Sequence, residues 1–152
     1  MDKTYLNPTQ DAGREFFQRN IVGEVVMLNL LRFRQIADYS VAPNLTPINS
    51  ISGEAAYQLY IEHTLPVLRK SGGDILFFGK GGAFLIGPNN ESWDAVLLVR
   101  QNSVADFMSF ASDQEYLKGI GHRTAALEDS RLLPMVENKI MEQERLEKTQ
   151  VT

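Results

Sequence analysis

The chain has 152 residues, of which 43% are hydrophobic and 22% are charged, a profile typical of a soluble globular protein with one domain and a substantial core. It contains no cysteine, which excludes a disulfide framework and thiolate chemistry. The net charge of −4 and the scattered basic residues argue against nucleic-acid binding, and no apolar run approaches the roughly 20 residues of a membrane helix. The N-terminal sequence lacks the apolar stretch of a signal peptide, so we expect a cytoplasmic protein with a single domain over residues 1–152.

The first part of the chain predicts a helix, a strand and a long loop. Residues 8–20 have the pattern of a short helix, within an N-terminal helical extension over 1–22. Residues 24–33 are too apolar and β-branched for a surface helix and predict a buried strand. The segment 34–52 contains two prolines and several turn-forming residues, so we expect a long loop, and loops of this length often serve as lids or binding loops.

The middle of the chain predicts a helix followed by a hairpin. Ser52 stands where an N-terminal cap is needed for a helix over 53–70, and Pro66 is expected to kink that helix. Residues 74–87 and 93–101 have the extended pattern of two strands. The turn-forming residues between these strands indicate that they pair with each other.

The last third of the chain predicts two helices and a final strand. Two capping-box patterns predict helices over 103–111 and 113–129. A short strand over 131–137 follows, and Pro134 indicates that it lies at an edge of the sheet or near a bulge. The tail over 138–152 is polar, and its apolar spacing is only weakly that of a helix.

The order of these elements predicts the fold class. Strand, helix, two strands, helix and strand, over a core of about 24–137, predict an α+β protein with a four-stranded antiparallel sheet and helices on one face. The other face carries valine, leucine and isoleucine and has no cover from the chain itself. We therefore expect a homodimer that forms through the open sheet face.

Four stretches of the sequence carry a resemblance to a known family. They are VVMLNLLRF, YQLYIEHTLPVLRKSGGDILFFG, WDAVLLVRQNSVADFMSFASDQEY and HRTAALEDSRLLP. Over about residues 24–137 the chain resembles the family catalogued as domain of unknown function 1330, of the dimeric α/β-barrel superfamily. The resemblance implies a ferredoxin-like fold and a homodimer whose two sheets face each other as a barrel. It implies no activity, although more distant relatives include cofactor-free monooxygenases of aromatic polyketides, muconolactone isomerases and haem-binding enzymes.

Arg123 is the first candidate for a functional residue. At helical spacing it shares a stripe with Tyr116, Ile120 and Leu127, which is the pattern of a face turned toward the core. A guanidinium in an apolar layer needs an anion or several acceptors. One interpretation is an internal salt bridge or a side chain that reaches the surface. The other is a pocket arginine that receives a carboxylate or enolate from a ligand.

Possible partners of Arg123 come from the helix over 53–70 and from the strand over 93–101. For the internal salt bridge the candidates are Asp94 and Glu62. For a ligand site, Tyr57 and Tyr60 lie on the core-facing side of the helix over 53–70, where each is either a packing residue or a hydroxyl that orients a ligand. His122 lies about 100° to the side of Arg123, at the rim of the same region.

Two further candidates come from the strands. Asn29 alternates with Met27 and Leu31, so its amide shares an apolar face with them and either makes a fixed internal hydrogen bond or lines a cavity. Trp93 opens the strand over 93–101 and is a candidate ligand-binding residue. Asp94 points to the opposite face, as a solvated charge or a base with a raised pKa.

The sequence contains no clear pattern for a cofactor or metal. The stretch GKGGAFLIG does not match a phosphate-binding loop and does not open a helix. The two histidines, His63 and His122, do not form a two-ligand motif. We therefore expect neither a metal site nor a cofactor.

The residues leave three functions open. The first is a cofactor-independent enzyme that acts on an organic acid, enol or aromatic substrate. In it Arg123 binds negative charge, and protons are positioned or moved by Tyr57, Tyr60, Asn29 or His122. The second is a non-catalytic module that binds a small acidic or aromatic ligand. The third is a dimerisation scaffold in which Arg123 is already satisfied. The sequence identifies neither the ligand nor the roles of the terminal extensions and the 34–52 loop.

Overall fold

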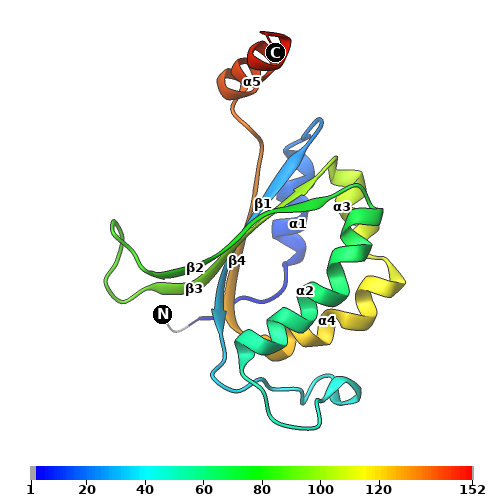
Figure 1. Ribbon diagram of the computed structural model, residues 1–152, viewed down its shortest axis with the longest axis vertical. Helices are drawn as coiled ribbons and strands as arrows, with labels where there is room; N and C mark the ends of the chain where they lie inside the picture. Colours follow the sequence, from blue (N-terminus) through cyan, green and yellow to red (C-terminus); the bar gives the residue numbers. More distant parts are fainter. Residues whose placement is uncertain (1–2, 152) are drawn as a thin grey trace.

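The computed structural model describes residues 3–151, with side chains as far as residue 149, so residues 1, 2 and 152 of the expected extensions lie outside the described residues. The elements in chain order are α1 (Gln10–Gln18), β1 (Val25–Phe33), a 3₁₀ turn η1 (Pro43–Leu45), α2 (Gly53–Lys70), β2 (Asp74–Ala83), β3 (Ser92–Gln101), α3 (Val104–Ala111), α4 (Gln114–Ala126), β4 (Leu127–Met135) and α5 (Lys139–Val151). Figure 1 shows a twisted sheet with α2, α3 and α4 on one side and α5 projecting from the body. None of the described helices is long and apolar enough to cross a membrane.

The four strands form one antiparallel sheet in the order β2-β3-β1-β4. This order arises because each helical connection skips one strand position, which is the ferredoxin-like arrangement. The expected fold class, α+β with a four-stranded antiparallel sheet and helices on one face, is confirmed. The expectation that the last strand lies at an edge is also confirmed, since β4 pairs only with β1.

Local signals place α2 where the sequence predicts it. The Ser52 side chain accepts a hydrogen bond from the amide of Ala55 at 3.0 Å and so caps the first turn. The helix continues through Pro66 to Lys70. Its buried side faces the sheet and α4, and it includes Tyr57 and Tyr60.

The boundary between α4 and β4 differs from the prediction. The sequence predicts a helix to residue 129 and a strand from 131, whereas α4 ends at Ala126 and β4 begins at Leu127. Leu127 already has extended backbone angles and lies opposite Phe33 of β1. Pairing with β1 outweighs the local helical pattern, because each paired residue gains ladder hydrogen bonds and a place in the sheet. The hairpin strand β2 is also shorter than predicted, since it ends at Ala83.

The core lies between the sheet and the helices α2 and α4. The inner side of the sheet contributes Leu31, Ala95 and Leu97, and the helices contribute buried aromatic rings. The ring pairs in this layer are Phe33–Tyr57, Tyr57–Tyr60, Tyr60–Tyr116 and Tyr116–Phe110, with centroids 4.5–6.1 Å apart.

The outer side of the sheet is apolar and has no helix over it in the described part of the chain (Figure 1). Leu28 and Leu30 of β1 lie opposite Leu98 and Val96 of β3, and all four are only half-buried. Large side chains at the margins are more exposed, as the 55% exposure of Leu133 on β4 shows. The described part of the chain therefore leaves this face of the sheet without a cover.

Candidate functional site

A groove of about 610 Å³ opens at the end of β1, where the chain leaves the sheet for the long loop. It lies between the first turn of α2 and the neighbouring parts of β2 and β3. The residues that line it are Phe33, Arg34, Gln35, Ser52, Glu54, Phe78, Gly79, Lys80, Gly81, Asp94 and Ala95. This volume is within the range of about 300–1,000 Å³ that ligand pockets usually have.

The groove combines aromatic surface with charged groups. Phe33 and Phe78 supply its apolar wall. The ring of Tyr57 packs against both of them, with ring centroids 5.6 Å from Phe33 and 6.2 Å from Phe78. The Nε atom of Arg34 is buried and has no hydrogen-bond partner among the described residues. A buried donor without an acceptor is costly, so a shift of the Arg34 side chain toward an acceptor would be favourable.

Two features hold the groove in shape. The carboxylate of Asp94 accepts a hydrogen bond from the Phe33 amide at 2.8 Å, so this acid anchors the end of β1. A Cβ atom on Gly53 would lie 2.3 Å from the Arg34 carbonyl oxygen, so only glycine allows the start of α2 to approach β1 this closely.

A second polar cluster lies in the core, between the helices and the sheet. The hydroxyls of Tyr60 and Tyr116 share a hydrogen bond of 2.9 Å. Burial raises the pKa of Tyr57 and of Tyr60, and the nearby positive charge of Arg123 opposes that rise. The structure therefore brings Arg123, Tyr57 and Tyr60 into one region, but none of them lines the groove.

Arg123 is half-buried and has only neutral partners. Its guanidinium donates to the carbonyl oxygen of Leu6 at 2.8 Å and to the hydroxyl of Ser130 at 3.5 Å. Among the described residues it forms no ion pair, so neither Asp94 nor Glu62 provides the internal salt bridge that was one interpretation of the sequence. The partner at Leu6 lies 117 positions away in the chain.

The segment that supplies this partner is bound along β4, and we refer to its residues Tyr5 and Leu6 as the N-terminal strap. The Tyr5 amide donates to Asp129 at 2.8 Å, and the Ser130 hydroxyl donates to the Tyr5 carbonyl at 2.6 Å. Leu6 packs its side chain against the core. Backbone and side-chain contacts thus place the strap over Arg123.

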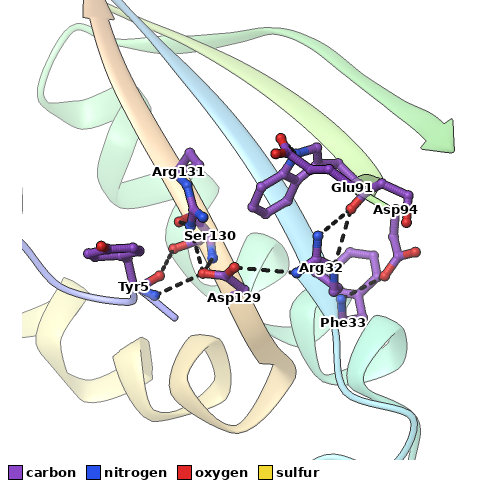
Figure 2. A network of polar contacts seen from close by, with 10 residues as sticks. Tyr5, Arg32, Phe33, Glu91, Asp94, Asp129, Ser130 and Arg131 are labelled. Carbon is purple, nitrogen blue, oxygen red and sulfur yellow. Dashed lines mark hydrogen bonds and ion pairs between the residues drawn. The ribbon is translucent and has the colours of Figure 1, made fainter. Parts of the chain in front are cut away.

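Asp129 is the centre of the polar network in Figure 2. Its carboxylate is fully buried and accepts hydrogen bonds from the Tyr5 and Ser130 amides and from Arg131, at 2.7–2.8 Å, and from Arg32 at 3.3 Å. Burial by itself raises the pKa of Asp129, but the hydrogen bonds outweigh burial and lower the pKa from its ordinary value.

The arginines of this network also contact aromatic rings. Arg32 and Arg131 lie 4.5 and 4.9 Å from the ring centroid of Trp93, and Arg131 lies 4.8 Å from that of Tyr5. Trp93 donates from its indole nitrogen to Glu91 at 3.0 Å. Trp93, a predicted ligand-binding residue, is therefore part of this network and not of the groove.

The remaining candidates have internal partners. Asn29 donates to the carbonyl oxygens of Met27 and Leu97, both at 3.3 Å, within the sheet. His122 shares a hydrogen bond of 2.7 Å with Tyr39 of the long loop, and burial, followed by the charge of His63, lowers the pKa of His122. Among the described residues no group of three acidic or histidine side chains is arranged to bind a metal.

Sequence reasoning missed the residues that shape both regions. Arg34 was assigned to the loop, although its position directly after an apolar strand and before a long loop was a usable signal. Asp129 was assigned to a helix end, and the strap has no sequence pattern that points to β4.

The chain was compared with known families, curated proteins and solved structures. No family model and no curated protein matches the chain. A solved structure of a dabb family protein with a ferredoxin-like fold from Mesorhizobium loti is 9% identical, covers 77% of this chain and 99% of its own, and has a TM-score of 0.49. A dimeric ferredoxin-like protein of unknown function from Thermobifida fusca is 11% identical, with 76% and 92% coverage and a TM-score of 0.44.

One comparison is much stronger. The RPA0582 protein of unknown function from Rhodopseudomonas palustris is 33% identical to this chain, with a TM-score of 0.78. The match covers 90% of this chain and 99% of that protein, so it includes more than the ferredoxin-like core. The chain therefore belongs to the same family as the RPA0582 protein of Rhodopseudomonas palustris.

Proposed function

We propose that this protein binds a small organic acid with an apolar or aromatic part in the groove at the end of β1. The observation that carries this proposal is that Arg34, whose Nε atom has no hydrogen-bond partner among the described residues, lines a groove of about 610 Å³. Lys80 adds a second cation, and Phe33 and Phe78 offer apolar surface to the rest of the ligand. A guanidinium prefers a carboxylate, because it can donate two parallel hydrogen bonds to it.

Calorimetric titration of the full chain with benzoate tests this proposal. We expect Arg34→Met to weaken binding at least tenfold, since a charge-assisted hydrogen bond contributes about 1.5–3 kcal/mol. Arg14→Met, which changes an exposed arginine on α1, is the matched control and should bind as the original protein does. Equal affinity of both variants for benzoate would show that the groove is not the binding site.

We also propose that the protein is a homodimer that forms through the open sheet face, as a dimeric α/β barrel, and that its family is the one catalogued as domain of unknown function 1330. The support is the uncovered apolar face around Leu28, Leu30 and Leu98. A second copy of the same face is a natural partner, because two such surfaces bury each other.

Light scattering distinguishes this assembly from a monomer, with an expected mass of about twice 17.1 kDa. Leu133→Glu places a charge on the exposed margin of the open face and should shift the mass toward that of a monomer. Leu85→Glu, at a fully exposed position in the hairpin loop, is the control and should leave the mass unchanged. A monodisperse monomer at micromolar concentration would contradict the proposed assembly.

A further inference from the structure

We infer that Arg123 and Ser130 form a second binding site, specific for a carboxylate, and that the N-terminal strap occupies this site as a built-in competitor. In this arrangement the Leu6 carbonyl oxygen takes the position that a ligand carboxylate oxygen would take. The site lies in the core at β4 and is separate from the groove, so it does not depend on the proposed function above.

The first argument is the charge of the cluster. Arg123 is half-buried, and its two partners, the Leu6 carbonyl and the Ser130 hydroxyl, are neutral. A partly desolvated guanidinium gains more from a carboxylate than from a carbonyl, because a carboxylate carries the opposite charge and can accept two parallel hydrogen bonds. These two partners leave the charge of Arg123 without a carboxylate to compensate it among the described residues.

The nearest buried carboxylate does not compensate that charge. Asp129 is adjacent to Ser130 in the sequence, but successive strand residues point to opposite faces, so its carboxylate lies on the outer side of the sheet. There it is already bonded to Arg32 and Arg131. The two cations of this outer network leave no negative charge available to Arg123.

The second argument is that the strap is held by few contacts. Three hydrogen bonds hold its backbone, namely those of Tyr5 with Asp129 and Ser130 and that of Leu6 with Arg123. The ring of Tyr5 lies 4.8 Å from Arg131. The helix that follows, α1, has no buried residue, and its contacts with the body are the Phe16–Phe107 ring pair at 6.2 Å and a hydrogen bond from Arg19 at its end to the Pro134 carbonyl at 2.8 Å. Segments with few buried contacts open at a low free-energy cost.

The strap also indicates the class of ligand. It presents a carbonyl oxygen to Arg123 and a branched apolar side chain, that of Leu6, to the core. A molecule that replaces the strap should combine the same two features, with a carboxylate in place of the carbonyl. Small aryl- or alkyl-acetic acids have this chemistry, and the hydroxyls of Tyr57 and Tyr60 lie in the same region.

Titration of the full chain with phenylacetate, followed through the side-chain ¹⁵N signals of its arginines, tests the inference. Tyr5→Pro removes the amide that donates to Asp129 and should loosen the strap. Leu6→Gly removes the apolar anchor and serves as a second variant. We expect both to raise the affinity reported by the Arg123 signal about tenfold, because a larger fraction of molecules is then competent to bind.

The controls separate this site from the groove. Arg123→Met in the Tyr5→Pro background should abolish the gain, and Arg34→Met in that background should preserve it. Phenylacetamide, which has the same shape without the charge, should not shift the Arg123 signal. If phenylacetate shifts only the Arg34 signal in both strap variants, or if phenylacetamide acts equally on Arg123, the inference is wrong, whereas the groove proposal is unaffected.

Discussion

The two faces of β4 hold two buried polar centres of opposite character. On the outer face, the carboxylate of Asp129 accepts four hydrogen bonds, two of them from arginines (Figure 2). On the inner face, the guanidinium of Arg123 has two neutral acceptors, one of which is at the long distance of 3.5 Å. The centres are linked, because the strap donates to Asp129 through Tyr5 and accepts from Arg123 through Leu6.

This contrast separates a centre whose charge is compensated from one whose charge is not. The donors around Asp129 come from β1, β4 and the strap, so its charge is compensated and removal of the carboxylate affects several segments at once. Arg123 retains an uncompensated charge behind a weakly held segment. We therefore expect substitutions at Asp129 to act on stability and substitutions at Arg123 to act mainly on binding.

The largest expected effect is that of Asp129→Ala. Its loss leaves Arg32, Arg131 and two backbone amides without their common acceptor, and we expect the free energy of unfolding to fall by about 3 kcal/mol. Denaturant unfolding measures this loss. A decrease below about 0.5 kcal/mol, the size of an ordinary surface effect, would show that the outer network is not a structural centre.

The pH dependence of stability sharpens the same point. The pKa of Asp129 is lower in the folded protein than its ordinary value of 3.8, so the unfolded chain binds the proton more tightly. The stabilisation is therefore complete above pH 3.8 and is lost as the pH falls through the folded pKa. Between pH 7 and pH 2, the free energy of unfolding should fall more steeply for the original protein than for Asp129→Asn. Parallel pH profiles of the two proteins would contradict this assignment.

A smaller effect is expected for Arg123→Met. The substitution removes two hydrogen bonds to neutral acceptors but keeps most of the apolar stem, so we expect a loss of about 1 kcal/mol and an intact fold. Circular dichroism and denaturant unfolding check both expectations. Unfolding of this variant at room temperature would mean that Arg123 is a structural residue like Asp129, and the contrast between the two faces would disappear.

The smallest effect is expected for Trp93→Phe. The ring still offers a face to Arg32 and Arg131, but the hydrogen bond to Glu91 is lost, so we expect a change of about 0.5–1 kcal/mol. Thermal unfolding beside the original protein measures it. A loss as large as that of Asp129→Ala would show that the indole, and not the carboxylate, organises the outer face.

Part of the fold can be predicted from local sequence patterns, such as apolar periodicity and helix caps. The apolar pattern of residues 24–33 predicts β1 almost to the residue, and Ser52 marks the start of α2 correctly. The end of α4 was predicted incorrectly, because the segment from Leu127 to Asp129 has a helical pattern but pairs with β1. A local pattern contains no information about hydrogen bonds to a strand that lies almost 100 residues earlier in the chain.

The candidate sites follow the sequence less closely. Periodicity correctly indicated that Arg123, Tyr57 and Tyr60 face one region, but it could not supply their partners. The groove was missed because its lining comes from the ends of β1, β2 and β3 and from the first turn of α2. Such a surface exists only after the elements have packed, so no single segment carries its signature.

The sequence by itself therefore determined the alternation of its strands, the caps of its helices and the apolar character of both sheet faces, since these depend on neighbours within a few residues. Only the tertiary structure decided that Tyr5 meets Asp129 across 124 positions and that Leu6 meets Arg123 across 117. The physical reason is that periodicity specifies the direction in which a side chain points. Its partner depends on how distant segments pack, and that depends on the free energy of the whole chain.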